Sequence, residues 1–142
     1  MAEHLISHIG IAVSDLGRAT ETYRLITGAE PQYHDAPDQK VRVAMFGVAA
    51  DGYVGARIEL VAPTSDDSPI AKYLAKKGEG LHHICIYVDD IDSRLDELKS
   101  AGARLIDETP RIGAEGGRIA FVHPAASHGV LIELEERRSQ AG

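Results

Sequence analysis

The chain has 142 residues, 44% of them hydrophobic and 26% charged, which is an ordinary composition for a globular protein that buries a core. Its formal net charge of −7 argues against non-specific binding of nucleic acid or of an anionic membrane surface. Cys85 is the single cysteine, no apolar run approaches the ~20 residues that span a bilayer, and no secretory signal is visible. We therefore expect a cytoplasmic protein without an intramolecular disulfide.

The first half of the chain reads as a β-α-β-β-β unit. An alternating, β-branched run over residues 6–13 predicts a strand, and Ser14 or Asp15 can cap a helix over 17–27 that ends at Gly28. Turn residues separate the segments that follow. Three shorter strands are expected over residues 31–35, 41–48 and 55–62.

A linker over residues 66–80 follows this unit. Ser68-Pro69 is a helix start, and the spacing of Ile70, Tyr73 and Leu74 fits one apolar helix face. The sequence therefore predicts a helix that joins the two halves.

The second half has the same order of elements. A strand is expected over 82–88, then a helix over 92–100 capped by Asp89 or Asp90 and stopped by Gly102. Three strands are predicted over residues 104–107, 118–122 and 129–135. We therefore expect one α+β domain over residues 1–142, with module 1 over about 5–63, the linker helix over about 66–80 and module 2 over about 81–137.

The two halves are related by an internal repeat. His8-Ile9-Gly10-Ile11-Ala12-Val13 aligns with His83-Ile84-Cys85-Ile86-Tyr87-Val88 at an offset of 75 residues (83 − 8). Near the end of each half, Ile58-Glu59-Leu60 aligns with Ile132-Glu133-Leu134 at an offset of 74 residues (132 − 58). One residue is therefore missing from the second half.

The repeat places one histidine and one glutamate on the same sheet face in each half. Because side chains alternate along a strand, Ile9, Ile11 and Val13 are expected to pack on the helix while His8 points to the other face. The same alternation sets Glu59, between two packing residues, on that other face. His83 and Glu133 are the matching pair of the second half.

These four residues predict a metal site. Imidazole and carboxylate groups together suit a divalent ion such as Zn²⁺, Co²⁺, Ni²⁺, Fe²⁺ or Mn²⁺, and four protein ligands leave two octahedral positions open for a substrate. A lone histidine or glutamate on a strand is usually a core or solvated residue, but the duplication favours ligands. The histidines without a repeat partner are interpreted as non-ligands: His4, His34, His82, His123 and His128.

Several stretches resemble a known family. They are Ile58-Glu59-Leu60-Val61-Ala62-Pro63, Asp67-Ser68-Pro69-Ile70-Ala71-Lys72, Gly78-Glu79-Gly80-Leu81-His82-His83-Ile84-Cys85, Pro110-Arg111-Ile112-Gly113-Ala114 and Gly129-Val130-Leu131-Ile132-Glu133-Leu134. These stretches resemble the vicinal oxygen chelate superfamily, and in particular its methylmalonyl-CoA epimerases. The resemblance implies tandem βαβββ modules whose mixed sheet curls around a metal cleft, as in glyoxalases.

The resemblance also implies an activity and its residues. The expected ligands are His8, Glu59, His83 and Glu133, holding a divalent metal ion, Co²⁺ first and Zn²⁺, Ni²⁺ or Mn²⁺ as alternatives. The expected reaction interconverts (2R)- and (2S)-methylmalonyl-CoA by metal-assisted 1,1-proton transfer through an enediolate. Glu133 is the first candidate acid/base and Glu59 the second.

One departure leaves the second acid/base open. The strand Val41–Phe46 carries no acidic residue, whereas some epimerases have one there. The expected partners are a small acyl-CoA substrate and a second copy of the chain in a homodimer. Candidate groups for the CoA phosphates are Lys72, Lys76, Lys77, Arg111 and Arg118.

Rival functions on the same fold remain. A glyoxalase I-type lactoylglutathione lyase would use the same four-ligand shell. An extradiol dioxygenase fits less well, because it uses three protein ligands. A drug-binding resistance protein of the bleomycin-resistance kind would use the fold as a crevice without a catalytic metal.

Overall fold

The computed structural model describes residues 6–47 and 56–137, and the chain divides into two compact units. The first unit is His8–His82, and the second consists of Met1–Ser7 with His83–Gly142. His4 and the junction between the strands expected over 41–48 and 55–62 lie outside the described residues. In the part of the chain that is described, no helix is both long and apolar enough to cross a membrane.

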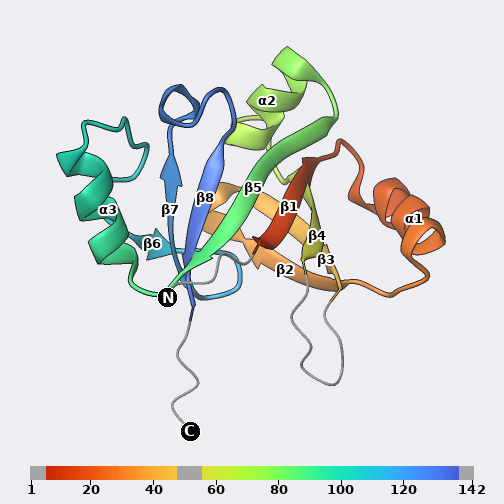
Figure 1. Ribbon diagram of the computed structural model, residues 1–142. Helices are drawn as coiled ribbons and strands as arrows, with labels where there is room; N and C mark the ends of the chain where they lie inside the picture. The colour runs from red at the N-terminus through yellow and green to blue at the C-terminus, as the bar shows by residue number, and fades with distance from the viewer. Residues whose placement is uncertain (1–5, 48–55, 138–142) are drawn as a thin grey trace, which may run out of the picture. The chain divides into compact units, whose positions relative to one another are not determined.

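The first unit has the predicted order of elements (Figure 1), with the boundaries between the units falling inside β1 and β5. The elements are β1 (Ile6–Ala12), α1 (Leu16–Thr27), β2 (Gln32–Ala36), the 3-10 helix η1 (Pro37–Gln39), β3 (Val41–Phe46), β4 (Arg57–Pro63) and α2 (Pro69–Lys77). Its strands lie in the order β2-β3-β4-β1, in which β1 and β4 are parallel and the other pairs antiparallel. The parallel pair sets the register between the first and last strands of the module.

Helix α1 is defined by its two ends and by one apolar face. The side chain of Asp15 accepts a hydrogen bond from the Arg18 amide at 3.1 Å, and Gly28 ends the helix with a left-handed φ of 69°. The apolar face packs on the sheet. The core beneath α1 consists of Val13, Ala44, Phe46, Leu60 and Ala62, with Ile11, Leu16, Ala19, Tyr23 and Ile58 packed against them. The prediction that alternate strand residues face the helix is thus confirmed for Ile11, Val13, Ile58 and Leu60, whereas Ile9 is not among the residues of this core.

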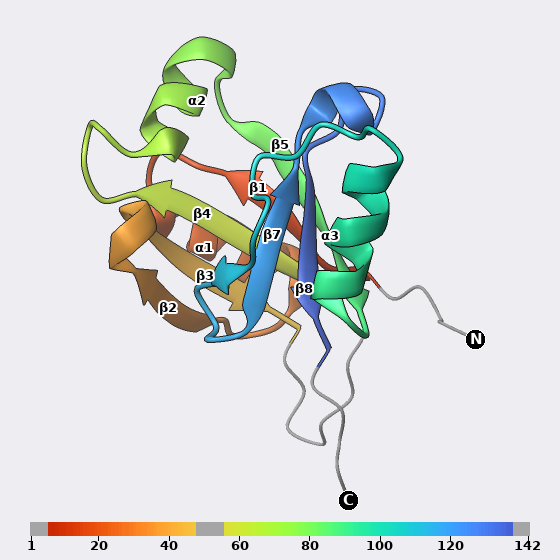
Figure 2. The same cartoon turned by 90° about the vertical axis from the view of Figure 1, so that its left-hand side faces the viewer.

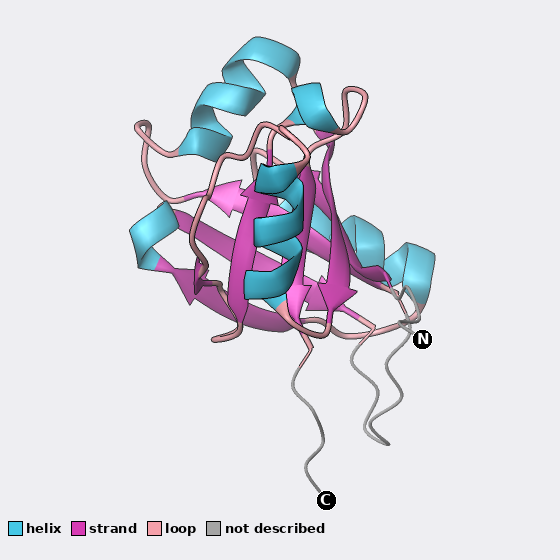
Figure 3. Ribbon diagram, turned by 60° about the vertical axis from the view of Figure 1, so that its left-hand side comes forward, coloured by secondary structure: helices cyan, strands magenta, loops and turns pink. Residues whose placement is uncertain are grey.

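The second unit repeats this plan. Its elements are β5 (Gly80–Val88), α3 (Ile91–Ser100), β6 (Arg111–Ile112), β7 (Arg118–Val122), the 3-10 helix η2 (Pro124–Ala126) and β8 (Ile132–Glu136). The strand order is β5-β8-β7-β6, and β5 and β8 are parallel. Helix α3 packs against β7 and β8 (Figure 2). Figure 3 shows the same helices and strands coloured by type. The core under α3 consists of Ile91, Leu95, Ala120, Val122 and Leu134.

The prediction of a strand over residues 104–107 is wrong. Leu105 makes only an isolated bridge to β7, and the edge strand of this unit is β6 instead. The amides of Ile106 and Asp107 both donate to the carbonyl of Phe121, at 3.0 and 3.1 Å. The Asp107 carboxylate then accepts the Phe121 amide at 2.8 Å. A side chain therefore replaces the backbone acceptor that a continuing ladder would need.

The cap of α3 supports a stability prediction. The Asp90 carboxylate accepts a hydrogen bond from the Ser93 amide at 3.1 Å. Asp90→Ala should lower the free energy of unfolding by about 1 kcal/mol, because an N-terminal amide loses its acceptor. Asp96→Ala, at an exposed position inside the same helix, is the control. Equal stabilities of the two variants in urea denaturation would contradict the capping role.

The loop before α2 supports a prediction about acid. Hydrogen bonds, first from Lys40 and then from Ser65, lower the pKa of Asp67 from 3.8 to about 2. Because the folded pKa lies below the unfolded one, this carboxylate stabilises the fold above about pH 4 and loses that effect as the pH falls towards 2. Asp67→Asn should therefore show a smaller loss of unfolding free energy than the parent protein over this range. Asp66→Asn should behave as the parent does.

Candidate metal centre

The first unit brings His8 and Glu59 together. In the parallel pairing of β1 with β4, Gly10 lies opposite Glu59, and His8 lies two residues before Gly10 on the same sheet face. His8 Nε2 lies 3.6 Å from Glu59 Oε1. Both residues are buried, with exposed fractions of 3% and 7%. The predicted common face of these two side chains is thus present.

The second unit brings His83 and Glu133 together in the same way. Cys85 lies opposite Glu133 in the parallel pairing of β5 with β8, and His83 is again two residues earlier. His83 Nε2 lies 3.1 Å from Glu133 Oε1. The imidazole also meets the ring of Phe121 edge-on, with centroids 5.9 Å apart. The internal repeat of the sequence is therefore also a repeat of strand register.

The donor atoms of each pair fit a divalent cation. One imidazole nitrogen and one carboxylate oxygen are close together, and burying a carboxylate is costly unless a positive charge or a hydrogen-bond donor compensates it. Zn²⁺, Co²⁺, Ni²⁺ and Mn²⁺ all accept this mixture of nitrogen and oxygen ligands. Each unit therefore supplies one half of the predicted ligand set, His8 with Glu59 and His83 with Glu133.

Cys85 is a neutral neighbour of the second pair. Burial, followed by the charges of Glu133 and Glu135, holds the pKa of the Cys85 thiol well above its usual range. The side chain is fully buried, and its sulfur lies 3.6 Å from Glu135 Oε1. Cys85 thus contributes packing and a weak hydrogen bond, and it remains a thiol.

Two of the histidines predicted to be non-ligands have other contacts, and a third has a place in a strand. His82 packs edge-on against Tyr73 of α2, with centroids 4.7 Å apart. His123 Nδ1 accepts the Ala125 amide at 3.0 Å and caps η2. His34 lies on β2 opposite Val43. His82 and His123 are therefore engaged elsewhere, while the Nε2 atom of His34 is buried without a hydrogen-bond partner.

Two further charged residues lie on the faces that carry the His–Glu pairs, and the sequence analysis missed both. Arg57 precedes Glu59 by two residues on β4, lies opposite His8 in the register and is 8% exposed. Glu135 follows Glu133 by two residues on β8 and accepts the Ser7 hydroxyl at 2.8 Å. The signal for both was present, because the same two-residue alternation extends one step further along each strand.

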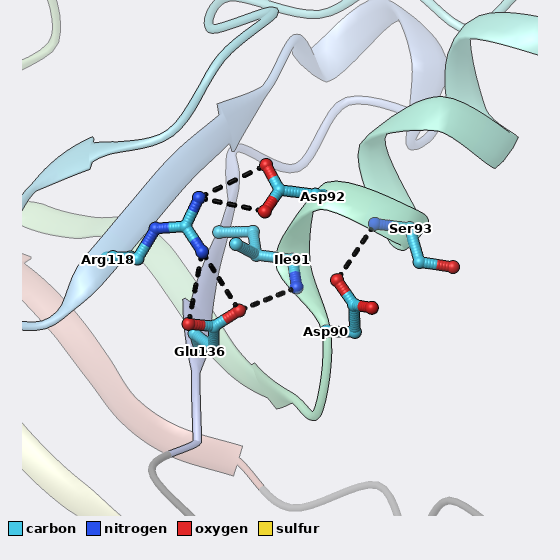
Figure 4. Close-up of polar contacts among 6 residues, drawn as sticks. All are labelled: Asp90, Ile91, Asp92, Ser93, Arg118 and Glu136. Carbon is cyan, nitrogen blue, oxygen red and sulfur yellow. Dashed lines mark hydrogen bonds and ion pairs between the residues drawn. The ribbon is translucent and has the colours of Figure 1, made fainter.

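Two members of an acidic cluster beside α3 are paired with an arginine. Oxygen atoms of Asp90, Asp92 and Glu136 lie within 4.8 Å of one another, as metal ligands do. Arg118, however, contacts Asp92 at 2.9 Å and Glu136 at 3.3 Å, and Glu136 also accepts the Ile91 amide at 3.1 Å (Figure 4). The hydrogen bond to Asp92 raises the pKa of Arg118 above its ordinary value. This cluster is therefore a charge network that holds α3 against β7 and β8.

The chain is similar to known proteins in both sequence and structure. The model of the glyoxalase/bleomycin resistance protein/dioxygenase superfamily matches residues 7–121. The chain belongs to this superfamily. The predicted α+β fold of tandem βαβββ modules, the fold of glyoxalase-like proteins, is confirmed by this match and by the observed element order.

Individual members of this glyoxalase-like superfamily are close relatives. The ethylmalonyl-CoA/methylmalonyl-CoA epimerase of Cereibacter sphaeroides is 42% identical over 92% of this chain and 96% of its own. The mitochondrial methylmalonyl-CoA epimerase of Dictyostelium discoideum is 38% identical, covering 93% of this chain and 78% of its own. A solved methylmalonyl-CoA epimerase in complex with methylmalonyl-CoA and NH4+ has a TM-score of 0.86 and 38% identity, over 97% of both chains. The resemblance to epimerases that the sequence suggested is thus confirmed.

Proposed function

We propose that the protein is a methylmalonyl-CoA epimerase, an isomerase that interconverts the (2R) and (2S) forms of its substrate. One observation carries the proposal: each unit places a buried His–Glu pair at the same register position of its parallel strands. Relatives and solved structures that are methylmalonyl-CoA epimerases support it. They favour an epimerase over a lactoylglutathione lyase or a drug-binding protein of the same superfamily.

The two pairs together would hold one divalent ion, with His8, Glu59, His83 and Glu133 as its ligands and Co²⁺ as the first candidate. Burial of each of the four side chains to 7% exposure or less supports a ligand role for it, because a buried carboxylate needs a compensating charge or hydrogen-bond donor. When bound, such an ion would stabilise negative charge that develops on a carbonyl oxygen. The active form would be a cytoplasmic homodimer.

The glutamates would move the proton. Epimerisation removes a proton from one face of the carbon between thioester and carboxylate and returns one to the opposite face. Glu133 is the first candidate for this role, because its carboxylate is buried and has an imidazole 3.1 Å away that holds its orientation. Glu59 is the corresponding carboxylate of the other unit. Burial of both keeps bulk water from the carboxylates.

The test is isotope exchange with a controlled metal content. The protein is stripped with a chelator, reloaded with Co²⁺, and incubated with a single methylmalonyl-CoA epimer in deuterated water. We expect deuterium at the α-carbon and formation of the other epimer, both lost on stripping. Absence of exchange in the Co²⁺-loaded protein, or turnover of methylglyoxal with glutathione in its place, would overturn the proposal. Elemental analysis gives a readout of the metal that is independent of activity.

A further inference from the structure

Helix α2 carries a group of cations without carboxylate partners. Lys72, Lys76 and Lys77, here called the lysine patch, are all exposed and follow one another at spacings of four and one residues. Within residues 6–47 and 56–137, no ion pair involves them. Six of the other described cations are paired with carboxylates, namely Arg24, Lys40, Arg42, Arg94, Arg111 and Arg118.

Helix stability accounts for only part of the lysine patch. Lys76 and Lys77 lie in the last turn of α2, where a positive charge interacts favourably with the helix dipole. Lys72 lies in the first half of the helix, where this effect is absent. A concentration of three unpaired cations on one nine-residue helix also stands out in a chain of net charge −7. The patch therefore has the electrostatics of an anion-binding surface.

The helix that carries the lysine patch packs on a strand that carries a member of the first His–Glu pair. Helix α2 packs against β4, the strand that carries Glu59 (Figure 2). The Tyr73 hydroxyl donates to the Leu81 carbonyl at 2.7 Å, and Lys77 Nζ lies 5.9 Å from the centre of the Tyr73 ring. These contacts fix α2 to the start of β5.

An exposed apolar residue lies beside the lysine patch. Leu81 is 69% exposed although it is a large hydrophobic side chain, and its carbonyl is the group that binds Tyr73. A ligand that carries both phosphates and apolar groups matches this combination of ammonium groups without carboxylate partners and an exposed leucine. Coenzyme A is such a ligand, since its phosphates are joined to an adenine ring and an aliphatic pantetheine arm.

We infer that the lysine patch binds the phosphates of the acyl-CoA substrate and that Leu81 packs against its apolar part. This inference rests on the proposed function, because it names the part of the site that recognises the coenzyme. The sequence suggested two sets of residues for binding the CoA phosphates, and the ion pairs of the structure favour the lysines over the arginines. Arg111 and Arg118 are held by carboxylates, whereas the three lysines of α2 are available.

The test compares two triple variants of equal charge. Lys72→Gln/Lys76→Gln/Lys77→Gln removes the lysine patch, and Lys99→Gln/Arg104→Gln/Arg137→Gln removes three exposed cations of the second unit. Each changes the formal net charge from −7 to −10 (−7 − 3). Binding of coenzyme A and of adenosine 3′,5′-bisphosphate to the full-length proteins is measured by calorimetry. We expect the Kd of the α2 variant to rise about tenfold, with little change in the control.

Turnover gives the second readout. The α2 variant should have a raised KM for methylmalonyl-CoA and an unchanged kcat/KM for methylmalonyl-pantetheine, which lacks the phosphates. Equal weakening in both triple variants, or an unchanged Kd in the α2 variant, would overturn the inference while leaving the epimerase proposal intact. Lysine-dependent binding of coenzyme A by a protein without isotope exchange would support the coenzyme site and overturn the epimerase proposal.

Discussion

Glu133→Gln is expected to lower the rate of α-proton exchange by about 10²- to 10⁴-fold, the usual contribution of a general acid or base. Glutamine keeps the volume and one carbonyl oxygen of the glutamate, so the packing of β8 against its neighbours is retained. It removes the negative charge that faces His83 Nε2 at 3.1 Å, and with it the capacity to accept and return a proton. Exchange in deuterated water measures the loss directly.

The metal content of the same variant distinguishes the two roles of Glu133. Retained Co²⁺ with lost exchange would assign it to proton transfer, and lost Co²⁺ would assign it at least to ligation. His83→Ala should lose both metal and exchange. Glu97→Gln, at an exposed position of α3, is the matched control and should keep both. A Glu133→Gln protein that exchanges at the parent rate would remove Glu133 from the proposed mechanism.

Leu60→Ala is expected to lower the free energy of unfolding by about 2–5 kcal/mol. The Leu60 side chain is fully buried in the core beneath α1, where it lies among Phe46, Ala44 and Val13. Truncation there loses apolar burial and leaves a cavity in a close-packed layer. Chemical denaturation followed by circular dichroism measures the change.

Leu25→Ala is the matched control for this variant. It makes the same chemical change on α1, but the Leu25 side chain is 88% exposed, so we expect a change within about 0.5 kcal/mol. A comparable loss in both variants would mean that the layer between α1 and the sheet does not dominate the stability of this unit.

Local patterns were sufficient to predict most of the fold. Asp15 and Asp90 cap their helices as their residue type and position indicate, and Gly28 supplies the left-handed residue that ends α1. Strand alternation identified the residues that pack on the helices. The prediction for segment 104–107 was wrong because its apolar character fits a strand. In the structure the Asp107 carboxylate accepts the hydrogen bond of the Phe121 amide that a strand ladder would use. Such competition between side chain and backbone depends on tertiary geometry.

The candidate site was predictable only in part, for a related reason. The repeat identified His8, Glu59, His83 and Glu133, because duplication marks positions that a single strand would not. The repeat gave no sign of Arg57, since this position has no charged counterpart in the second half. Its importance follows from the pairing of β1 with β4, which places it opposite His8. Pairing between strands that are distant in the chain is not encoded in the pattern of either strand.

The register shared by the two halves has a consequence for how they can diverge. Opposite Glu59 the backbone presents glycine, and opposite Glu133 it presents the thiol-bearing Cys85. The cross-strand neighbour of Glu59 therefore has no side chain, whereas that of Glu133 carries a sulfur atom. Duplication has preserved the scaffold while the side chains around each acid have become different. The same strand register can therefore carry two carboxylates with chemically different surroundings.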